Sequence, residues 1–85
     1  MSRIIIYSTG TCPICDKAKQ LFKKWNLDYQ ESRVDLDKNA LKEMLSITNH
    51  ARMVPQFVID DKWIGGFTEL TELHMDGELD TLINN

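Results

Sequence analysis

The chain has 85 residues, which is the size of one small domain. Hydrophobic residues make up 42% and charged residues 27%, near the averages for soluble globular domains, and no apolar run approaches the ~20 residues that span a bilayer. The net charge is −3 with both signs interspersed, which gives no sign of the basic patch of nucleic-acid binders. We therefore expect one domain over residues 1–85, without a membrane or nucleic-acid partner.

The first predicted element is the β-branched and aromatic run from Ile4 to Tyr7, which is typical of a buried strand. Polar residues with Gly10 end this run before the apolar region of a signal peptide can form, so nothing marks export. Pro13 then suits the first turn of a helix, because its missing N–H costs nothing there. Apolar residues follow at helical spacing up to Asn26, which can end the helix: Ile14, Ala18, Leu21, Phe22 and Trp25.

The middle of the chain predicts a second strand and a second helix. Tyr29 to Val34 weakly predicts the strand. Asp37 can cap the helix, which ends near Asn49 and His50. The apolar residues of this helix are Leu41, Met44 and Leu45.

The last third predicts a hairpin followed by a helix. Pro55 disfavours the helical region for Val54, so the chain is extended there. A third strand at 57–59 turns at 60–62 into a short fourth strand at 63–64, which two glycines end. Thr68 then caps a helix that Gly77 ends, and the apolar residues beyond it indicate a last helical turn: Leu79, Leu82 and Ile83.

The resulting order is β-α-β-α-β-β-α. A helix joins the first two strands, which favours a parallel pair, whereas the last two form an antiparallel hairpin. We therefore expect an α/β domain with a four-stranded mixed sheet and helices packed on it.

Two cysteines lie at the start of the first helix, in the motif Cys12-Pro13-Ile14-Cys15. At a helix start, residues i and i+3 lie on the same side, so the two sulfurs can approach bonding distance. Unpaired N–H groups and the helix dipole stabilise an anion at Cys12, so its thiol pKa should fall from ~8.5 into the range of about 3.5–7.5. Cys15 lies one turn further in, where burial disfavours its thiolate. The motif predicts Cys12 as nucleophile and Cys15 as the thiol that resolves a mixed disulfide.

A purely structural role is the alternative for this pair. Two cysteines are too few for a disulfide-stapled scaffold, and a four-ligand zinc site would need two more ligands in range. His50 and His74 stand at spacings unlike any zinc signature, so we expect no metal. In a protein that is not exported, so close a pair is more often reactive than structural.

Two further segments can serve a ligand. If Pro55 is cis, the backbone of Val54 turns toward a ligand, and its N–H and C=O can pair with an extended peptide. Gly65 and Gly66 precede a helix whose N-terminus can bind a carboxylate. Taken separately, each segment is equally compatible with an ordinary strand start or turn.

These motifs resemble the glutaredoxin family, in its dithiol Cys-Pro-x-Cys form. The resemblance covers nearly the whole chain and implies a thioredoxin-like fold, with helices on both faces of the sheet. It rests on three motifs in this order and spacing: Thr11-Cys12-Pro13-Ile14-Cys15, Val54-Pro55-Gln56 and Ile64-Gly65-Gly66-Phe67. Together the three are highly specific.

The resemblance implies a cis Pro55 and a glutathione groove across Cys12, Val54 and the turn after Gly66. The cysteine of glutathione would pair with the backbone of Val54. Its γ-glutamyl carboxylate would meet the N–H groups at the last helix start, and two cations are candidates for its glycyl carboxylate. The full set of candidate glutathione-binding residues is Thr11, Pro13, Lys17, Arg52, Met53, Val54, Pro55, Gly66, Phe67 and Thr68, of which Lys17 and Arg52 are the cations.

Four positions depart from the usual family pattern. Many members have Tyr or Phe where Ile14 stands, and Lys or Arg where Thr9 stands. Met53 replaces a common Thr, and Glu69 replaces a common Asp. The basic residue missing at Thr9 is one that helps to hold the thiolate and an anionic ligand.

The activity that the resemblance implies is glutathione-dependent reduction of glutathione mixed disulfides and protein disulfides. Electrons would come from glutathione and, upstream, from NADPH through glutathione reductase. The recipients would be glutathionylated or disulfide-bonded proteins, with ribonucleotide reductase as one candidate. We expect a monomer in the cytosol.

Two other functions stay open at this point. One is a glutaredoxin-like electron donor that thioredoxin reductase serves; Thr9 favours it mildly, and the second glycine at Gly66 argues against it. The other is a carrier in which Cys12 and glutathione bridge two protomers around a [2Fe–2S] cluster. Pro13 and Cys15 argue against the carrier, because such proteins usually have Gly after a single cysteine.

Overall fold

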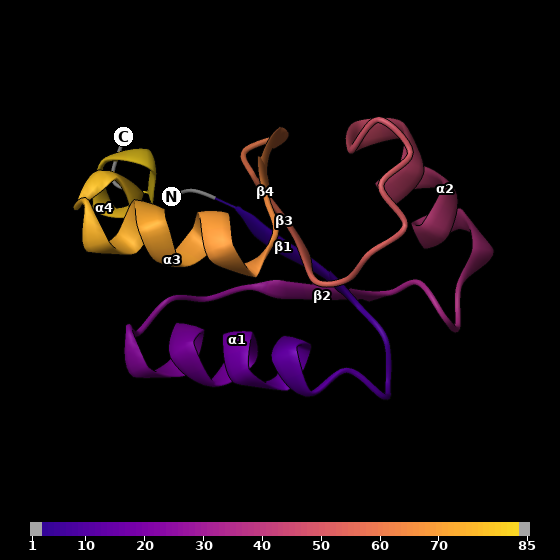
Figure 1. The fold of residues 1–85 in the computed structure, drawn as a ribbon, viewed down its shortest axis with the longest axis horizontal. Coiled ribbons are helices and arrows are strands. Elements are labelled where there is room, and N and C mark those ends of the chain that lie inside the picture. The colour runs from indigo at the N-terminus through magenta and orange to yellow at the C-terminus, as the bar shows by residue number, and fades with distance from the viewer. Residues whose placement is uncertain (1–2, 84–85) are drawn as a thin grey trace.

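The computed structural model describes residues 3–83. These residues form four strands and four helices (Figure 1). In chain order the elements are β1 (Ile4–Ser8), α1 (Pro13–Lys24), β2 (Gln30–Arg33), α2 (Lys38–Ile47), β3 (Gln56–Ile59), β4 (Lys62–Gly65), α3 (Phe67–Met75) and α4 (Glu78–Ile83). The predicted order is therefore confirmed, and the last helical turn forms the short helix α4.

The four strands form one mixed sheet in the order β2-β1-β3-β4. β1 runs parallel to β2, with Ile5 opposite Gln30, and antiparallel to β3, with Ile4 opposite Ile59. β3 and β4 form the expected antiparallel hairpin, with a register shift between Phe57 and Val58. The predicted mixed sheet, its parallel β1–β2 pair and its antiparallel β3–β4 hairpin are thus confirmed, and the structure adds that β1 lies between β2 and β3.

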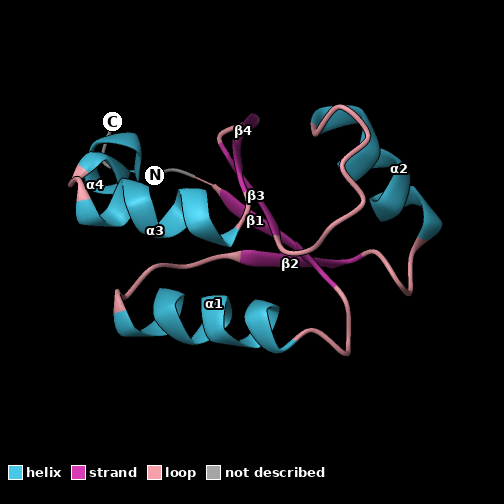
Figure 2. Ribbon diagram, in the orientation of Figure 1, coloured by secondary structure: helices cyan, strands magenta, loops and turns pink. Residues whose placement is uncertain are grey.

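Helices cover both faces of the sheet, with α1 and α3 on one side and α2 on the other (Figures 1 and 2). Alternate residues of a strand point to opposite faces, so β1 contributes to two apolar layers. One layer joins Ile4 and Ile6 to α1, α3 and α4, and the other joins Ile5 and Tyr7 to Met44 of α2. All five residues of β1 are therefore buried: Ile4 to Tyr7 as the continuous apolar run predicts, and also the polar Ser8, which lies beyond that run. Residues 3–83 contain no helix that is long and apolar enough to cross a membrane.

The helix boundaries follow from caps that the sequence mostly reveals. Asp37 caps α2 by accepting hydrogen bonds from the N–H groups of Asn39 and Ala40. Asn26 and Asn49 adopt the left-handed conformation after α1 and α2, with φ of 58° and 56°.

The prediction that Thr68 caps α3 is wrong. The N-cap is Gly66, two residues earlier, and Thr68 lies inside the first helical turn. Glu69 explains the earlier start, because its carboxylate accepts the Gly66 N–H at 2.7 Å and so supplies a partner at the helix end. Gly65 permits this arrangement: it has φ +111°, and a Cβ there would lie 2.7 Å from Cγ of Glu69.

Candidate active site

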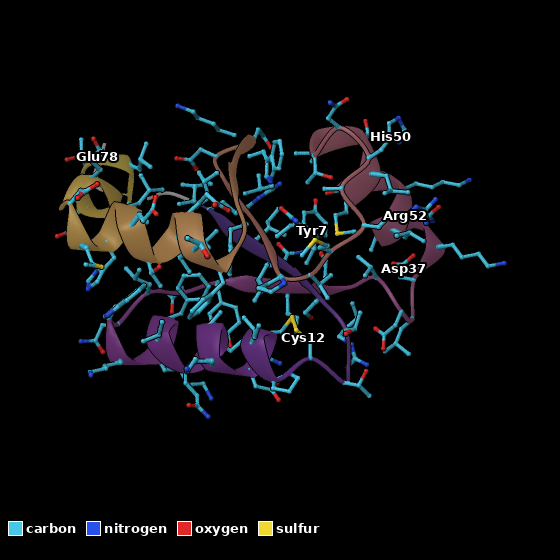
Figure 3. All side chains as sticks on the ribbon, viewed as in Figure 1. Tyr7, Cys12, Asp37, His50, Arg52 and Glu78 are labelled. Atoms are coloured by element: carbon cyan, nitrogen blue, oxygen red, sulfur yellow. A yellow bond between two sulfur atoms is a disulfide. The ribbon has the colours of Figure 1, made fainter. Side chains whose placement is uncertain are left out.

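The two cysteines lie at the N-terminus of α1 and form a disulfide in this structure (Figure 3). Their Cα atoms are 5.2 Å apart, which confirms that the i and i+3 positions of the motif bring the sulfurs within bonding distance. Cys12 is the N-cap residue and is partly exposed, whereas Cys15 is completely buried one turn later. Solvent thus reaches one residue of the pair and not the other.

The surroundings of the Cys12 sulfur suit an anion. Its Sγ accepts the backbone N–H of Cys15 at 3.0 Å, and α1 directs its N-terminal dipole at the same atom. Once the disulfide is reduced, this N–H faces the thiolate of Cys12. A sulfur in this position is favoured in its charged form by both the hydrogen bond and the helix end.

The loop before β3 brings a backbone edge to the same sulfur. The carbonyl oxygen of Val54 lies 3.9 Å from Sγ of Cys12, although the two residues are 42 positions apart in the sequence. The Val54–Pro55 bond is cis, as the resemblance implies. Within residues 3–83 the N–H of Val54 makes no hydrogen bond, so this edge keeps a donor for another molecule.

A groove of about 400 Å³ extends from this edge to the start of α3. Six of the predicted binding residues line it: Met53, Val54, Pro55, Gly66, Phe67 and Thr68. Four residues that were not assigned a binding role line it as well: Ile14, Gln56, Trp63 and Glu69. The groove therefore joins the loop before β3 to the end of β4 and the first turn of α3.

The first turn of α3 presents backbone donors at the far end of this groove. The first intrahelical bond to Gly66 O comes from Leu70, so the N–H groups of Phe67 and Thr68 lie ahead of the helical ladder. Donors of this kind, together with the helix dipole, bind carboxylates. The groove thus has backbone hydrogen-bonding groups at both ends.

The remaining predicted residues lie outside the lining of the groove. Thr11 and Pro13 flank Cys12 in the chain and are exposed. Lys17 is exposed on α1. Arg52 is exposed in the loop between α2 and β3, as Figure 3 shows. Long side chains can move toward a bound ligand, so the roles of these two cations stay predictions.

An ion pair fastens the loop that leads from β1 to Cys12. Arg33 donates two hydrogen bonds of 2.8 Å to the carboxylate of Asp35, and the same carboxylate accepts the N–H of Gly10 at 3.0 Å. These contacts hold the pKa of Asp35 far below its usual range; the hydrogen bond from Arg33 is the larger cause and the one from the Gly10 N–H the smaller. The sequence did not indicate this contact, because it joins β2 to a loop 25 residues away.

A second polar cluster holds α1 against the sheet. The carboxylate of Glu31 accepts the hydroxyl of Ser8 at 2.6 Å and the ammonium of Lys19 at 2.9 Å. The Ser8 hydroxyl and then Lys19 lower the pKa of Glu31, while Glu31 raises the pKa of Lys19. Ser8 ends β1 and Lys19 belongs to α1, so the cluster fixes both elements on either side of the cysteine loop.

Comparison with known proteins identifies the family. The family model for glutaredoxin matches residues 4–64, which include both cysteines and Pro55. The chain belongs to the glutaredoxin family. A probable glutaredoxin of Synechocystis sp. is 37% identical over 84 residues, covering 99% of this chain and 96% of that protein. A glutaredoxin of Pseudomonas aeruginosa is 36% identical, with 99% of each chain covered.

Solved glutaredoxin structures share this fold. The crystal structure of a buckwheat glutaredoxin–glutathione complex superposes with a TM-score of 0.85 at 28% identity, over 98% of this chain and 77% of that one. Glutaredoxin 1 of Francisella tularensis, crystallised with cacodylate, gives 0.75 at 33% identity, over 94% and 99% of the two chains. The family, the thioredoxin-like fold and the redox-active cysteine pair together make this glutaredoxin a thiol–disulfide oxidoreductase.

Two residues of this glutaredoxin groove were missed by sequence reasoning. From the sequence, Gln56 is recognised only as the last residue of the Val54-Pro55-Gln56 motif, and Trp63 only as part of the short fourth strand at 63–64. Both line the groove, and the indole N–H of Trp63 donates to Oε1 of Gln56 at 2.9 Å. Trp63 pairs with Val58 and not with Gln56 in the β3–β4 hairpin, so no direct signal in the sequence indicates this contact.

Proposed function

We propose that this glutaredoxin uses glutathione to reduce glutathione mixed disulfides and protein disulfides. The observation that carries the proposal is the unequal exposure of Cys12 and Cys15 beside a groove with backbone donors at both ends. An exposed thiolate can attack an incoming disulfide, and a buried neighbour can only act on the product of that attack. The buckwheat complex shows a related protein with glutathione bound, which supports this choice of ligand.

In the monothiol route, the Cys12 thiolate attacks the glutathionyl sulfur of a mixed disulfide. A Cys12–glutathione disulfide forms while the substrate sulfur leaves as a thiolate and takes a proton from water. The thiolate of a second glutathione then attacks the glutathionyl sulfur, which yields oxidised glutathione and returns the Cys12 thiolate. The N-terminus of α1 stabilises the negative charge on Cys12 at the beginning and the end of this cycle.

In the dithiol route, Cys12 attacks one sulfur of a protein disulfide and becomes joined to the substrate. Cys15 then attacks the Cys12 sulfur, the second substrate thiol is released, and the Cys12–Cys15 disulfide forms. This oxidised state is the one in the structure. Two glutathione molecules reduce it again and leave as oxidised glutathione.

In this proposal each part of glutathione has a partner in or beside the groove. The cysteinyl residue pairs with the N–H and C=O of Val54, next to the Cys12 sulfur. The γ-glutamyl carboxylate accepts from the N–H groups of Phe67 and Thr68 at the start of α3. Lys17 and Arg52 are the cations proposed for the glycyl carboxylate.

The test is turnover of a glutathionylated peptide with two alternative reductants. One reaction contains glutathione, glutathione reductase and NADPH, and the other contains thioredoxin reductase and NADPH. We expect turnover only with glutathione. Turnover only with thioredoxin reductase would contradict the proposal, and a brown, cluster-containing protein on purification would favour the carrier.

A further inference from the structure

Two consecutive hydrogen bonds, here called the Trp63–Gln56–Met53 relay, connect β4 to the loop that contains Val54. The indole N–H of Trp63 donates to Oε1 of Gln56 at 2.9 Å, and Nε2 of Gln56 donates to the carbonyl oxygen of Met53 at 3.0 Å. Gln56 is 7% exposed, so its amide depends on these partners rather than on water. All three residues of this relay line the groove described above.

The two outer groups of the relay, the Trp63 indole and the Met53 carbonyl, allow only one orientation of the Gln56 amide. An indole nitrogen can only donate, and a backbone carbonyl can only accept. If the amide turned over, its NH₂ group would face the indole N–H and its oxygen would face the Met53 carbonyl. Trp63 therefore selects the orientation in which Gln56 holds Met53.

Holding the Met53 carbonyl also sets the direction of the Val54 N–H. The bond between Met53 and Val54 is trans, since Val54–Pro55 is the one cis bond among residues 3–83. In a trans peptide unit the C=O and the N–H point in opposite directions. The Val54 N–H thus points away from Gln56, and within the described residues it has no hydrogen bond of its own.

We propose that Trp63 is a positioning residue, which acts through Gln56 to fix the Met53–Val54 peptide for substrate binding. The inference rests on the glutathione-dependent function proposed above, because it is the cysteinyl residue of glutathione that would use the Val54 edge. Trp63 touches none of the reacting sulfurs in this role. Its effect is on how well the substrate binds, and the reactivity of Cys12 is unaffected.

The indole ring could instead act only as an apolar wall of the groove, and two variants separate these roles. Trp63→Phe keeps an aromatic ring but removes the N–H. Trp63→His removes the benzene part of the indole but can place Nε2–H at the position of the indole nitrogen in the five-membered ring. A hydrogen-bonding role predicts that histidine rescues function and phenylalanine does not.

The kinetic experiment measures KM and kcat for a glutathionylated peptide with glutathione as reductant. Loss of one hydrogen bond should raise the KM of Trp63→Phe about two- to ten-fold, with kcat unchanged, and Trp63→His should return KM to the wild-type value. The pH profile of Cys12 alkylation should be the same in all three proteins. A wild-type KM in Trp63→Phe, or an equal rise in both variants, would overturn the inference.

A second measurement does not depend on glutathione. In ¹H–¹⁵N spectra of the uniformly labelled proteins, the side-chain NH₂ of Gln56 and the backbone N–H of Val54 should shift in Trp63→Phe and stay near wild type in Trp63→His. The other amide signals report that each variant is folded. If wild type fails to turn over the peptide while these shifts occur, the proposed function is wrong and the positioning by Trp63 stands. Unshifted Gln56 and Val54 signals in Trp63→Phe would refute the positioning itself.

Discussion

Cys12 and Cys15 lie within one helical turn of each other, yet their surroundings differ. Cys12 is partly exposed, and its sulfur contacts the N–H of Cys15 and the Val54 carbonyl, whereas Cys15 is completely buried. An attack on a large substrate needs an accessible sulfur, and resolution of an intermediate needs only a neighbouring one. This difference divides the proposed reaction between the two residues.

The first prediction follows from this division of roles. Cys12→Ser should abolish all turnover, because no other thiol can reach the substrate. Cys15→Ser should keep reduction of glutathione mixed disulfides, where glutathione itself resolves the intermediate, but lose most reduction of protein disulfides. Mass spectrometry of Cys15→Ser after exposure to a glutathionylated peptide should show the added mass of one glutathione. Substantial turnover by Cys12→Ser would show that the nucleophile is misassigned.

The second prediction concerns Thr9, where the family resemblance leads us to expect a cation. Thr9→Lys should lower the pKa of Cys12, because a nearby positive charge favours the thiolate. Rates of alkylation measured against pH give this pKa. Thr9→Gln has a similar reach without the charge and should leave the pKa as it is in wild type. A charge effect also weakens at high ionic strength, so a shift that persists unchanged in about 1 M salt would contradict this explanation.

Sequence reasoning identified the residues whose roles depend on local geometry and missed those that depend on distant pairing. Cys12 and Asp37 were recognisable because a helix start has the same geometry in every protein. Trp63 and Gln56 meet only because of the register of the β3–β4 hairpin, which contains an irregularity between Phe57 and Val58. Such a shift decides which side chains face each other, and the residue types alone do not reveal it.

At the scale of the elements, the boundaries of α1 and α2 followed from their caps, and the start of α3 did not. Thr68 is a good capping residue by type, but Gly66 caps α3 and Glu69 closes the turn from inside. N-cap propensity ranks residue types at a given helix start, but it does not by itself determine at which residue the helix starts. The choice here depends on Gly65, which adopts a positive φ and has no Cβ to collide with the Glu69 side chain.

The third prediction tests this arrangement at the start of α3. Glu69→Ala should lower the free energy of unfolding by about 1 kcal/mol, because the Gly66 N–H loses its partner at the helix end. Chemical denaturation measures the change, with Glu72→Ala as a matched control on the same helix, where no side-chain bond to the backbone is lost. Equal effects of the two substitutions would mean that the Glu69 contact does not stabilise α3.

At the scale of the whole molecule, one sheet carries two apolar layers, and the continuous apolar run of β1 predicted that both of its faces would be covered. The resemblance implied that helices lie on both faces, whereas which helix covers which face was not predicted. α2 buries Met44 completely, and its Leu41 and Ile47 pack partly buried against the same apolar layer. A polar contact adds to this attachment: the hydroxyl of Tyr7, fully buried in β1, donates to the carboxylate of Glu43 at 2.7 Å.

The last prediction uses Tyr7 to measure this attachment through the pH dependence of stability. Burial, and then the hydrogen bond to Glu43, raise the pKa of Tyr7 well above its usual value. As the pH rises past about 10, the unfolded chain loses this proton and the folded chain keeps it, so stability falls. Below that pH the protonated Tyr7 therefore makes its full contribution to the free energy of unfolding. Above it, this free energy falls by up to about 1.4 kcal/mol per pH unit.

Tyr7→Phe should remove the part of the fall in the free energy of unfolding at alkaline pH that Tyr7 causes. At neutral pH the same variant should be less stable by about 1 kcal/mol, because the hydrogen bond is missing. Glu43→Gln is the matched control: it keeps an acceptor for the hydroxyl and removes only the charge, and burial remains the larger cause of the shift. The slope should therefore persist in Glu43→Gln. Denaturant titrations of the three proteins between about pH 8 and pH 11, a range centred near the usual tyrosine pKa, give these slopes directly. If Tyr7→Phe and wild type lose stability in parallel, the hydroxyl is ionised in the folded protein and does not tie α2 to the sheet.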